Sequence, residues 1–303
     1  MDLSIVVVSY NTRALLERCL HSIHAHMVGL TSETIVVENA SEDGSADMVA
    51  TTFPDAILVR NDTNRGFAAA VNQGIGASSG RHVLLLNSDA MLVEEAARKM
   101  VTHLDAHPGV AAIGGTLLNV DGSFQGSYAD FPTILTETLL LTGLSRWLLP
   151  PTFPSRSAAE SQQLRTVDWV CGAFLMLRRV ALDNIGYFDE RYFMYAEEVD
   201  WCYRARQSGW HVTFLPEARA THLVAGSYGR NPMRRRLQIY RSKWLYFRKH
   251  HSRIEAAAFH SLVRLASCVK LAAWTMFGLG GSPVRRARAQ ENVVSYRYLL
   301  NHF

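Results

Sequence analysis

The sequence has few cysteines, and they are widely spaced along the chain. Its 303 residues include four cysteines, and no two of these lie close together in the chain. This spacing fits neither a zinc site nor a disulfide framework, and it favours a reducing compartment. The chain also has no basic stretch before its first apolar run, so we expect no secretory signal peptide.

Long apolar runs and internal repeats are missing as well. The longest uncharged run near the C-terminus covers residues 271–284, which is shorter than the roughly 20 residues of a membrane-spanning helix. We therefore expect no segment that crosses a membrane. With 48% hydrophobic and 19% charged residues, the composition is that of a globular protein with one large α/β domain and an appendage.

Acidic residues are scarce near the C-terminus. Residues 230–303 hold 15 Lys and Arg but only Glu255 and Glu291, a net charge of +13, whereas residues 1–229 carry −9. Aromatic and apolar side chains alternate with these basic residues, as in helices that lie on an anionic membrane surface. The alternative is a pair of helices packed on the body of the protein or on a second copy in a homo-oligomer. Nucleic acid is a disfavoured partner for these basic residues, because the motifs in residues 1–229 predict a different ligand.

Short apolar runs alternate with helical patterns through the first 115 residues. Strands are expected at 5–8, 34–37, 57–59, 83–86 and 110–113, and helices at 14–23, 45–51, 66–77 and 94–106. This order predicts an α/β fold with a Rossmann-like, mostly parallel sheet and helices on both faces. Further along we expect a hairpin at 121–122, a loop over 144–166, strands at 167–177 and 212–215, a helix at 198–208, and helices after 231 with breaks near 251 and 278–283.

Polar residues follow the predicted strands where each one ends. They are Ser9, Tyr10 and Asn11 after the first strand, Glu38 and Asn39 after the second, Arg65 and Gly66 after the third, and Asn87, Ser88 and Asp89 after the fourth. The carboxyl ends of parallel strands share one edge of a sheet, where open α/β sheets bind ligands. Each cluster alone is also typical of a cap or a turn. Together they predict a site in which Asp89 holds a divalent cation and a diphosphate.

Several segments occur in a characteristic order. They read S-I-V-V-V-S-Y-N at 4–11, I-V-V-E-N-A-S-E-D-G-S at 35–45, N-R-G-F-A-A-A-V-N-Q-G-I at 64–75, L-L-L-N-S-D at 84–89, W-V-C-G-A-F-L-M-L-R-R at 169–179 and G-Y-F-D-E-R-Y-F-M-Y-A-E-E-V-D-W-C-Y-R at 186–204, followed by His222. In this order they resemble the family 2 glycosyltransferases, which have a GT-A fold, and most of all the bacterial rhamnosyltransferases of cell-wall and surface polysaccharide synthesis. The resemblance implies an inverting, metal-dependent transfer from a nucleoside-diphosphate sugar, with dTDP-rhamnose the best single guess, to a glycan or lipid-linked acceptor.

The same resemblance assigns roles to the strand-end residues. Tyr10, Asn11, Glu38 and Arg65 would contact the base and ribose of the donor. The other donor-binding residues would be Ser9, Asn39, Gly66, Asn87 and Ser88, together with Asp89. Asp89 would be the last residue of the D-x-D motif, which reads N-S-D here, and would bind Mn²⁺ or Mg²⁺ together with His222. Glu38 stands where the family usually has Asp.

The resemblance places the general base among the acids that follow residue 196. Glu197 and Glu198 match a Glu-Asp pair whose second acid removes the acceptor proton, so Glu198 is the expected base. Because Glu is one methylene longer than Asp, Glu197 and Asp200 stay as alternatives. The structural alternative is an acidic helix N-terminus. Trp169, Gly172 and Glu197 would line the acceptor pocket.

Two other functions stay open. A sugar-nucleotide nucleotidyltransferase shares the sheet, but residues 9–13 lack its Gly-rich phosphate loop. A catalytically inactive carbohydrate-binding scaffold would suit the departures at Asn87 and Glu198. In the favoured interpretation, residues 1–229 form the catalytic domain, with a nucleotide-sugar half (1–115) and an acceptor half (116–229). Residues 230–303 then form a helical region that holds the enzyme on the inner face of the cytoplasmic membrane.

Overall fold

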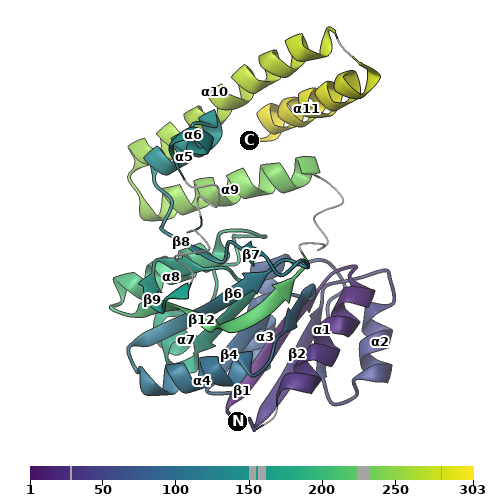
Figure 1. The fold of residues 1–303 in the computed structure, drawn as a ribbon, viewed down its shortest axis with the longest axis vertical. Coiled ribbons are helices and arrows are strands. Elements are labelled where there is room, and N and C mark those ends of the chain that lie inside the picture. Colours follow the sequence, from purple (N-terminus) through teal and green to yellow (C-terminus); the bar gives the residue numbers. More distant parts are fainter. Residues whose placement is uncertain (28, 150–154, 156–161, 224–231, 281) are drawn as a thin grey trace. The chain divides into compact units, whose positions relative to one another are not determined.

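The chain folds into two compact units. The computed structural model describes residues 1–27, 29–149, 155, 162–223, 232–280 and 282–303 (Figure 1). The first unit, here called the sheet unit, comprises residues 1–131, 151–193 and 197–227, and the second, the helical unit, comprises 132–150, 194–196 and 228–303. The helical unit therefore begins earlier in the chain than the basic tail.

The sheet unit is built on a mixed sheet whose main strands lie in the order β3-β2-β1-β4-β11-β6-β12-β5. Their bounds are β1 Leu3–Ser9, β2 Ser32–Glu38, β3 Ile57–Arg60, β4 His82–Leu86, β5 Ala90–Leu92, β6 Val110–Leu118, β11 Phe174–Arg178 and β12 His211–His222. Strands β1 to β4 run parallel to one another, as do β6 and β12. The predicted α/β fold is confirmed. The sequence did not show that β11 lies antiparallel between β4 and β6, or that β5 pairs antiparallel with β12.

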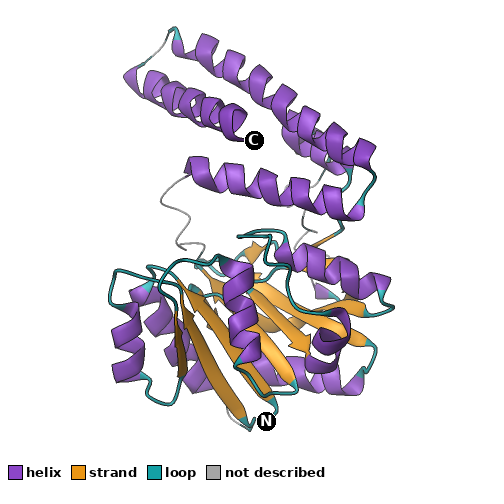
Figure 2. Cartoon of the chain, turned by 180° about the vertical axis from the view of Figure 1, so that it is seen from behind, coloured by secondary structure: helices purple, strands orange, loops and turns teal. Residues whose placement is uncertain are grey.

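Helices cover both faces of this sheet (Figure 2). They are α1 Arg13–His26, α2 Ser45–Thr52, α3 Phe67–Gly76, α4 Ala96–Ala106, α7 Arg179–Ile185 and α8 Glu197–Gln207. Successive strand residues face opposite sides, so Ile5 and Val7 join the core formed with α1 and α4, whereas Val6 meets α3. A Cβ at Gly74 of α3 would overlap the Val6 side chain, so this glycine allows the helix to approach the sheet.

Short strands complete the sheet unit. They are β7 Phe124–Gln125, β8 Tyr128–Ala129, β9 Arg165–Val167 and β10 Trp169–Val170. Strands β6 and β7 form the hairpin expected around Asp121-Gly122. The single strand expected over 167–177 is instead three strands with different partners, because the chain leaves the sheet at Asp168 and again at 171–173. The Asp168 carboxylate accepts a hydrogen bond from the backbone N–H of Phe131.

The helical unit contains α5 Ile134–Thr142, α6 Ser145–Leu148, α9 Pro232–His250, α10 Arg253–Gly278 and α11 Pro283–His302. The two expected breaks are present, and Ser252 caps α10 in a capping box with Glu255. The expectation that no segment is long enough to cross a membrane is wrong for α10. This helix continues through Arg264 and Lys270 for 26 residues and is apolar enough to cross a membrane by length and composition, a test that core helices of soluble proteins also pass.

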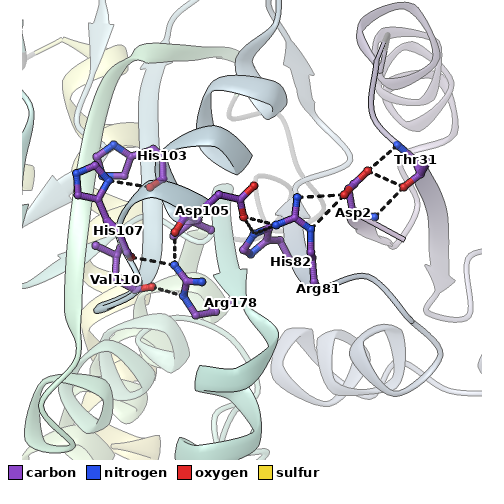
Figure 3. Close-up of polar contacts among 10 residues, drawn as sticks. Asp2, Thr31, Arg81, His82, His103, Asp105, His107, Val110 and Arg178 are labelled. Atoms are coloured by element: carbon purple, nitrogen blue, oxygen red, sulfur yellow. Dashed lines mark hydrogen bonds and ion pairs between the residues drawn. The ribbon is translucent and has the colours of Figure 1, made fainter.

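A polar network joins the strands at the edge opposite the predicted ligand site (Figure 3). His82 begins β4, is 1% exposed, and has its Nε2 2.9 Å from Asp105 Oδ1 of α4. Arg81 forms ion pairs with both Asp105 and Asp2. Arg178, at the end of β11, donates to the carbonyl oxygen of Val110. Parallel and antiparallel strands are thus held together by charged side chains.

We expect this network to make the fold less stable below a pH of about 6.5, the ordinary pKa of histidine. Burial lowers the pKa of His82 despite the nearby Asp105 carboxylate. Its Nδ1 is buried with no hydrogen-bond partner, so protonation there would create a buried, unpaired donor. The unfolded chain therefore binds the proton first, and the free energy of unfolding falls as the pH drops through this window.

Urea unfolding across this pH range measures the effect. His82→Gln, which cannot titrate, should flatten the dependence of stability on pH. The exposed His24 serves as the matched control, and His24→Gln should leave the dependence as it is. An equally steep dependence in the His82 variant would contradict the assignment.

Candidate active site

The carboxyl ends of β1, β2 and β4 bring the first polar clusters to one edge of the sheet. Ser9 ends β1 directly beside Glu38, the last residue of β2. Asn87 follows the last residue of β4, a strand that is buried along its whole length. Ser88 and Asp89 come next and are buried too. The structure thus places all three clusters around the end of β1.

A chain of buried hydroxyl groups links the first cluster to the last. Ser9 Oγ lies 3.0 Å from Thr12 Oγ1, which lies 2.9 Å from Ser88 Oγ. The sequence analysis did not single out Thr12, which stands directly before α1 but makes no capping bond with its side chain. Its position directly after the Ser-Tyr-Asn cluster was the only signal. The chain holds the Asp89 turn against the end of β1.

Asn39 organises the neighbouring loop. Its side chain is 2% exposed and donates from Nδ2 to Asn64 Oδ1 at 2.9 Å and to the carbonyl oxygen of Gly66 at 3.1 Å. Its Oδ1 accepts from the backbone N–H of Arg65 at 3.0 Å and from Asn61 at 3.1 Å. With its hydrogen-bonding groups engaged in this way, Asn39 positions Arg65 rather than offering its own amide to a ligand.

Glu38 and Asn11 order the loop that follows β2. Glu38 Oε1 accepts from the backbone N–H of Ser41 at 2.8 Å. Asn11 adopts a positive φ of 54°. Its backbone N–H donates to Ser41 Oγ, and its Oδ1 accepts from the backbone N–H of Glu42. Tyr10 lies between Ser9 and Asn11 in the chain, directly after the end of β1.

Arg65 and Gly66 have separate tasks. The Arg65 guanidinium is 3.8 Å from Glu190 and the two side chains are about half exposed, so the pair is weak and a ligand can replace it. Gly66 has a φ of +84°, and a Cβ there would overlap the backbone of Phe193. The backbone N–H of Phe67 donates to the carbonyl oxygen of Phe193 at 2.6 Å. Gly66 therefore allows close contact between two chain segments and contributes no side chain to a ligand.

Asp89 and His222 meet at the end of β12. His222 Nε2 is 3.2 Å from Asp89 Oδ1, and both side chains are largely buried. His222 Nδ1 is 2.6 Å from Gln125 Oε1, an oxygen that can only accept, so Nδ1 carries the hydrogen. The Gln125 amide nitrogen donates to Asn119 Oδ1 and to the carbonyl oxygen of His222. In the neutral ring, Nε2 then presents its lone pair to the same space as the Asp89 carboxylate.

This pair fits part of a divalent metal site. Adjacent ligands of an octahedral ion with bonds of about 2.1 Å stand about 3 Å apart, close to the spacing of Asp89 Oδ1 and His222 Nε2. Among the residues that the structure describes, no group of three or more His, Cys, Asp and Glu side chains could hold a metal. The described part of the chain therefore offers two ligands here, and oxygen atoms of a bound ligand or water would have to complete the coordination.

Glu197 and Glu198 begin α8 and are electrostatically coupled. Burial raises the pKa of Glu198, although backbone N–H groups, including that of Gly172, partly oppose this. Burial, together with the charge of Glu198, raises the pKa of Glu197 well above its ordinary value. One carboxyl oxygen of each is buried, with no hydrogen-bond partner among the described residues. Two such acids cannot both be charged at low cost, so Glu197 holds a proton more readily than Glu198.

Asp200 and Trp169 have structural contacts. The Asp200 carboxylate is fully buried, 3.0 Å from Arg204 Nε, and within reach of the Tyr192 hydroxyl at 3.4 Å. A charged acid paired in this way is a poor proton acceptor, which argues against Asp200 as the base. Trp169 is partly exposed and donates from its indole to the carbonyl oxygen of Asp130. Gly172 lies directly beside Glu198.

The sheet and the strand-end site define the class of protein first. The chain has the GT-A fold of nucleotide-sugar glycosyltransferases. Solved structures with this fold include the mannosyltransferase PcManGT from Pyrobaculum calidifontis in complex with GDP-Man and Mn²⁺, with a TM-score of 0.57 and 19% identity, covering 99% of this chain and 85% of that one. Another is S. aureus TarS 1–349 in complex with UDP, with a TM-score of 0.54 and 16% identity, covering 98% and 80%.

Sequence comparison then gives the family. The model of glycosyl transferase family 2 matches residues 4–186, and the chain belongs to this family. It is 29% identical to the N-acetylglucosaminyl-diphospho-decaprenol L-rhamnosyltransferase of Mycobacterium tuberculosis, over 82% of this chain and 85% of that protein. It is 27% identical to the low-salt glycan biosynthesis hexosyltransferase Agl10 of Haloferax volcanii, over 73% and 67%. The protein is a glycosyltransferase rather than a nucleotidyltransferase.

Proposed function

We propose that the protein transfers L-rhamnose from dTDP-rhamnose to a lipid-linked glycan acceptor with inversion at the anomeric carbon. The observation that carries the reaction type is the pairing of Asp89 with His222 at the carboxyl edge of the sheet. The choice of sugar and acceptor is supported by the similarity to the mycobacterial rhamnosyltransferase, whose name states that it uses a diphospho-decaprenol.

Asp89 and His222 would hold Mn²⁺ or Mg²⁺. Their two donor atoms suit such an ion when the diphosphate of the donor supplies further oxygens, and a neutral imidazole favours Mn²⁺. When bound, the ion would neutralise the charge that develops on the nucleoside diphosphate. Asn87, whose amide nitrogen is 3.4 Å from His222 Nε2, would take the place of the first acid of the motif as a neutral neighbour.

The remaining residues would bind the donor and accept the proton. Tyr10, Asn11, Glu38 and Arg65 would contact the base and ribose. Glu198 would accept the proton of the acceptor hydroxyl as that oxygen attacks. Glu197, kept protonated by burial and by the charge beside it, would leave Glu198 as the charged member of the pair.

Incubation of the full-length chain with dTDP-rhamnose, Mn²⁺ and a prenyl-diphosphate-linked N-acetylglucosamine tests this proposal. We expect release of dTDP and a rhamnosylated lipid with inverted configuration, detected by mass spectrometry and NMR. Parallel reactions with UDP- and GDP-sugars test the donor. Transfer from one of these alone would refute the choice of dTDP-rhamnose, and no transfer from any donor would refute the reaction.

We predict that Gln125→Leu weakens Mn²⁺ binding by about 10- to 100-fold, the usual cost of losing the partner of a histidine ligand. Gln125 Oε1 fixes the hydrogen of His222 on Nδ1, and leucine cannot accept it. Gln125→Glu keeps an acceptor at that position and is the matched control. Isothermal titration with Mn²⁺ and dTDP measures the affinity, and equal affinities of the leucine and glutamate variants would contradict the role.

We also propose that the helical unit holds the protein on the inner face of the cytoplasmic membrane. Its sequence is strongly basic, and large apolar side chains are exposed on α10 and α11, among them Leu265, Val269, Met276 and Val284. On the other side of α10, Ala256, Phe259, Val263 and Ser267 are buried at helical spacing. A helix with one face packed in the protein is better suited to lying on a membrane than to crossing it.

A further inference from the structure

The helical unit contains a pocket whose lining includes none of the residues discussed so far for catalysis. It has a volume of about 360 Å³ and is formed by residues of α5 and α9. Leu140, Leu141 and Ile239 contribute apolar walls, and Tyr240 contributes a phenol ring. Four charged residues complete the lining: Glu137, Arg235, Arg236 and Lys243.

The lining of this pocket carries more positive than negative charge. Lys243 Nζ is 2.6 Å from Glu137 Oε1, and Glu137 is 3% exposed, so these two groups neutralise each other. Arg236 donates from Nη1 to Ser295 Oγ and lies 4.6 Å over the ring of Tyr296, and both of these partners are uncharged. No acidic partner for Arg235 or Arg236 is found in the part of the chain that the structure describes.

More positive charge surrounds the pocket. Burial lowers the pKa of Lys270 on α10, and the charges of Arg236 and Arg146 lower it further. The positive charges of Arg236 on α9, Arg146 on α6 and Lys270 on α10 therefore act on the same region of the helical unit. Like charges gathered in a partly buried place repel one another, and a bound anion relieves that repulsion.

Apolar surface accompanies this charge. The pocket helix α5 packs against α10. Large apolar side chains are exposed on α5, in the segment that follows it and on α10: Leu135, Leu144, Trp147, Leu148, Leu265 and Val269. The ligand that such a combination fits has an anionic head and a long apolar chain. Two guanidinium groups suit a diphosphate, which carries more charge and more acceptor oxygens than the single phosphodiester of a phospholipid.

We propose that this pocket binds the diphosphate of a prenyl-diphosphate-linked acceptor, with Arg235 and Arg236 on the phosphate oxygens. Leu140, Leu141 and Ile239 contact the first part of the prenyl chain. The proposal deepens the proposed function and rests on it only in that the acceptor is linked to a lipid.

Binding of the full-length protein to phosphatidylcholine vesicles that contain farnesyl diphosphate tests the pocket. The exposed Arg235 is replaced in Arg235→Gln, and Arg297→Gln on α11, which removes the same charge from an exposed residue outside the pocket, is the matched control. We expect about tenfold weaker binding for the first variant, as for a lost charge-assisted hydrogen bond, and a change of about twofold or less for the second. Inorganic diphosphate should compete only weakly because it lacks the chain.

Three results would overturn the proposal. They are equal losses in the two variants, equal binding to vesicles that carry phosphatidylglycerol at matched charge, and inorganic diphosphate that binds as tightly as the lipid. The assay contains neither sugar donor nor metal. A negative result in this binding assay would therefore overturn the pocket proposal alone. Failure of the transferase reaction would appear only in the transfer assay.

Discussion

Glu198→Gln is expected to lower the turnover number by about 10² to 10⁴-fold, the usual contribution of a general base. The substitution keeps the shape of the side chain and its contact with the N–H of Gly172, but an amide cannot accept the proton of the acceptor hydroxyl. Substrate binding should change little, so the loss should fall on kcat rather than on KM. Steady-state transfer assays at saturating donor measure this.

Glu197→Gln is the matched control for that result. Because the pKa of Glu197 is raised well above its ordinary value, glutamine resembles the protonated form that this shift favours, and activity should persist within a few-fold. A deep loss with Glu197→Gln and a small one with Glu198→Gln would reverse the two roles.

Asp89→Asn should abolish most of the Mn²⁺-stimulated activity. Asparagine has the size of aspartate but no charge, so the site would keep only His222 as a strong protein ligand. Stabilisation of a leaving diphosphate by a metal is worth several kcal/mol, which corresponds to a loss of about 10² to 10³-fold in kcat/KM. Titration with Mn²⁺ should show a parallel loss of affinity.

Ser88→Ala provides the comparison for Asp89. It breaks the hydroxyl chain from Ser9 through Thr12 but leaves both proposed metal ligands in place, so its effect on Mn²⁺ affinity should be much smaller. If Asp89→Asn keeps full Mn²⁺ stimulation, the metal is bound elsewhere and the assignment of this edge as its site is wrong.

The sequence predicted the parallel half of the fold because each of its elements is encoded locally. The run that ends at Leu86 has the apolar composition of a strand buried on both faces, and all of β4 is buried. The break expected near residue 251 is likewise present, and a capping box of Ser252 and Glu255 begins α10 there. In both cases the sequence pattern that predicts the element lies within it or directly beside it.

Long-range partners could not be predicted in the same way. An apolar run such as 174–178 shows that a strand is buried, but not that it runs antiparallel between β4 and β6. Gln125 belongs to a strand of two residues and meets His222 only because β7 and β12 both pair with β6. The sequence analysis predicted that Asn39 binds the donor, but it could not show that the Asn39 side chain makes four hydrogen bonds that hold the loop around Arg65.

The insertion of β11 between β4 and β6 also determines when the sheet can be completed during synthesis. A growing chain that has reached residue 118 possesses both flanking strands, and β4 can already pair with β1. The strand that joins β4 to β6 is missing until residues 174–178 emerge. His222 arrives later still, as the last residue of β12. Strands of the predicted halves 1–115 and 116–229 thus alternate within one sheet. The contact between Asp89 and His222 can form only after more than a hundred further residues have been synthesised.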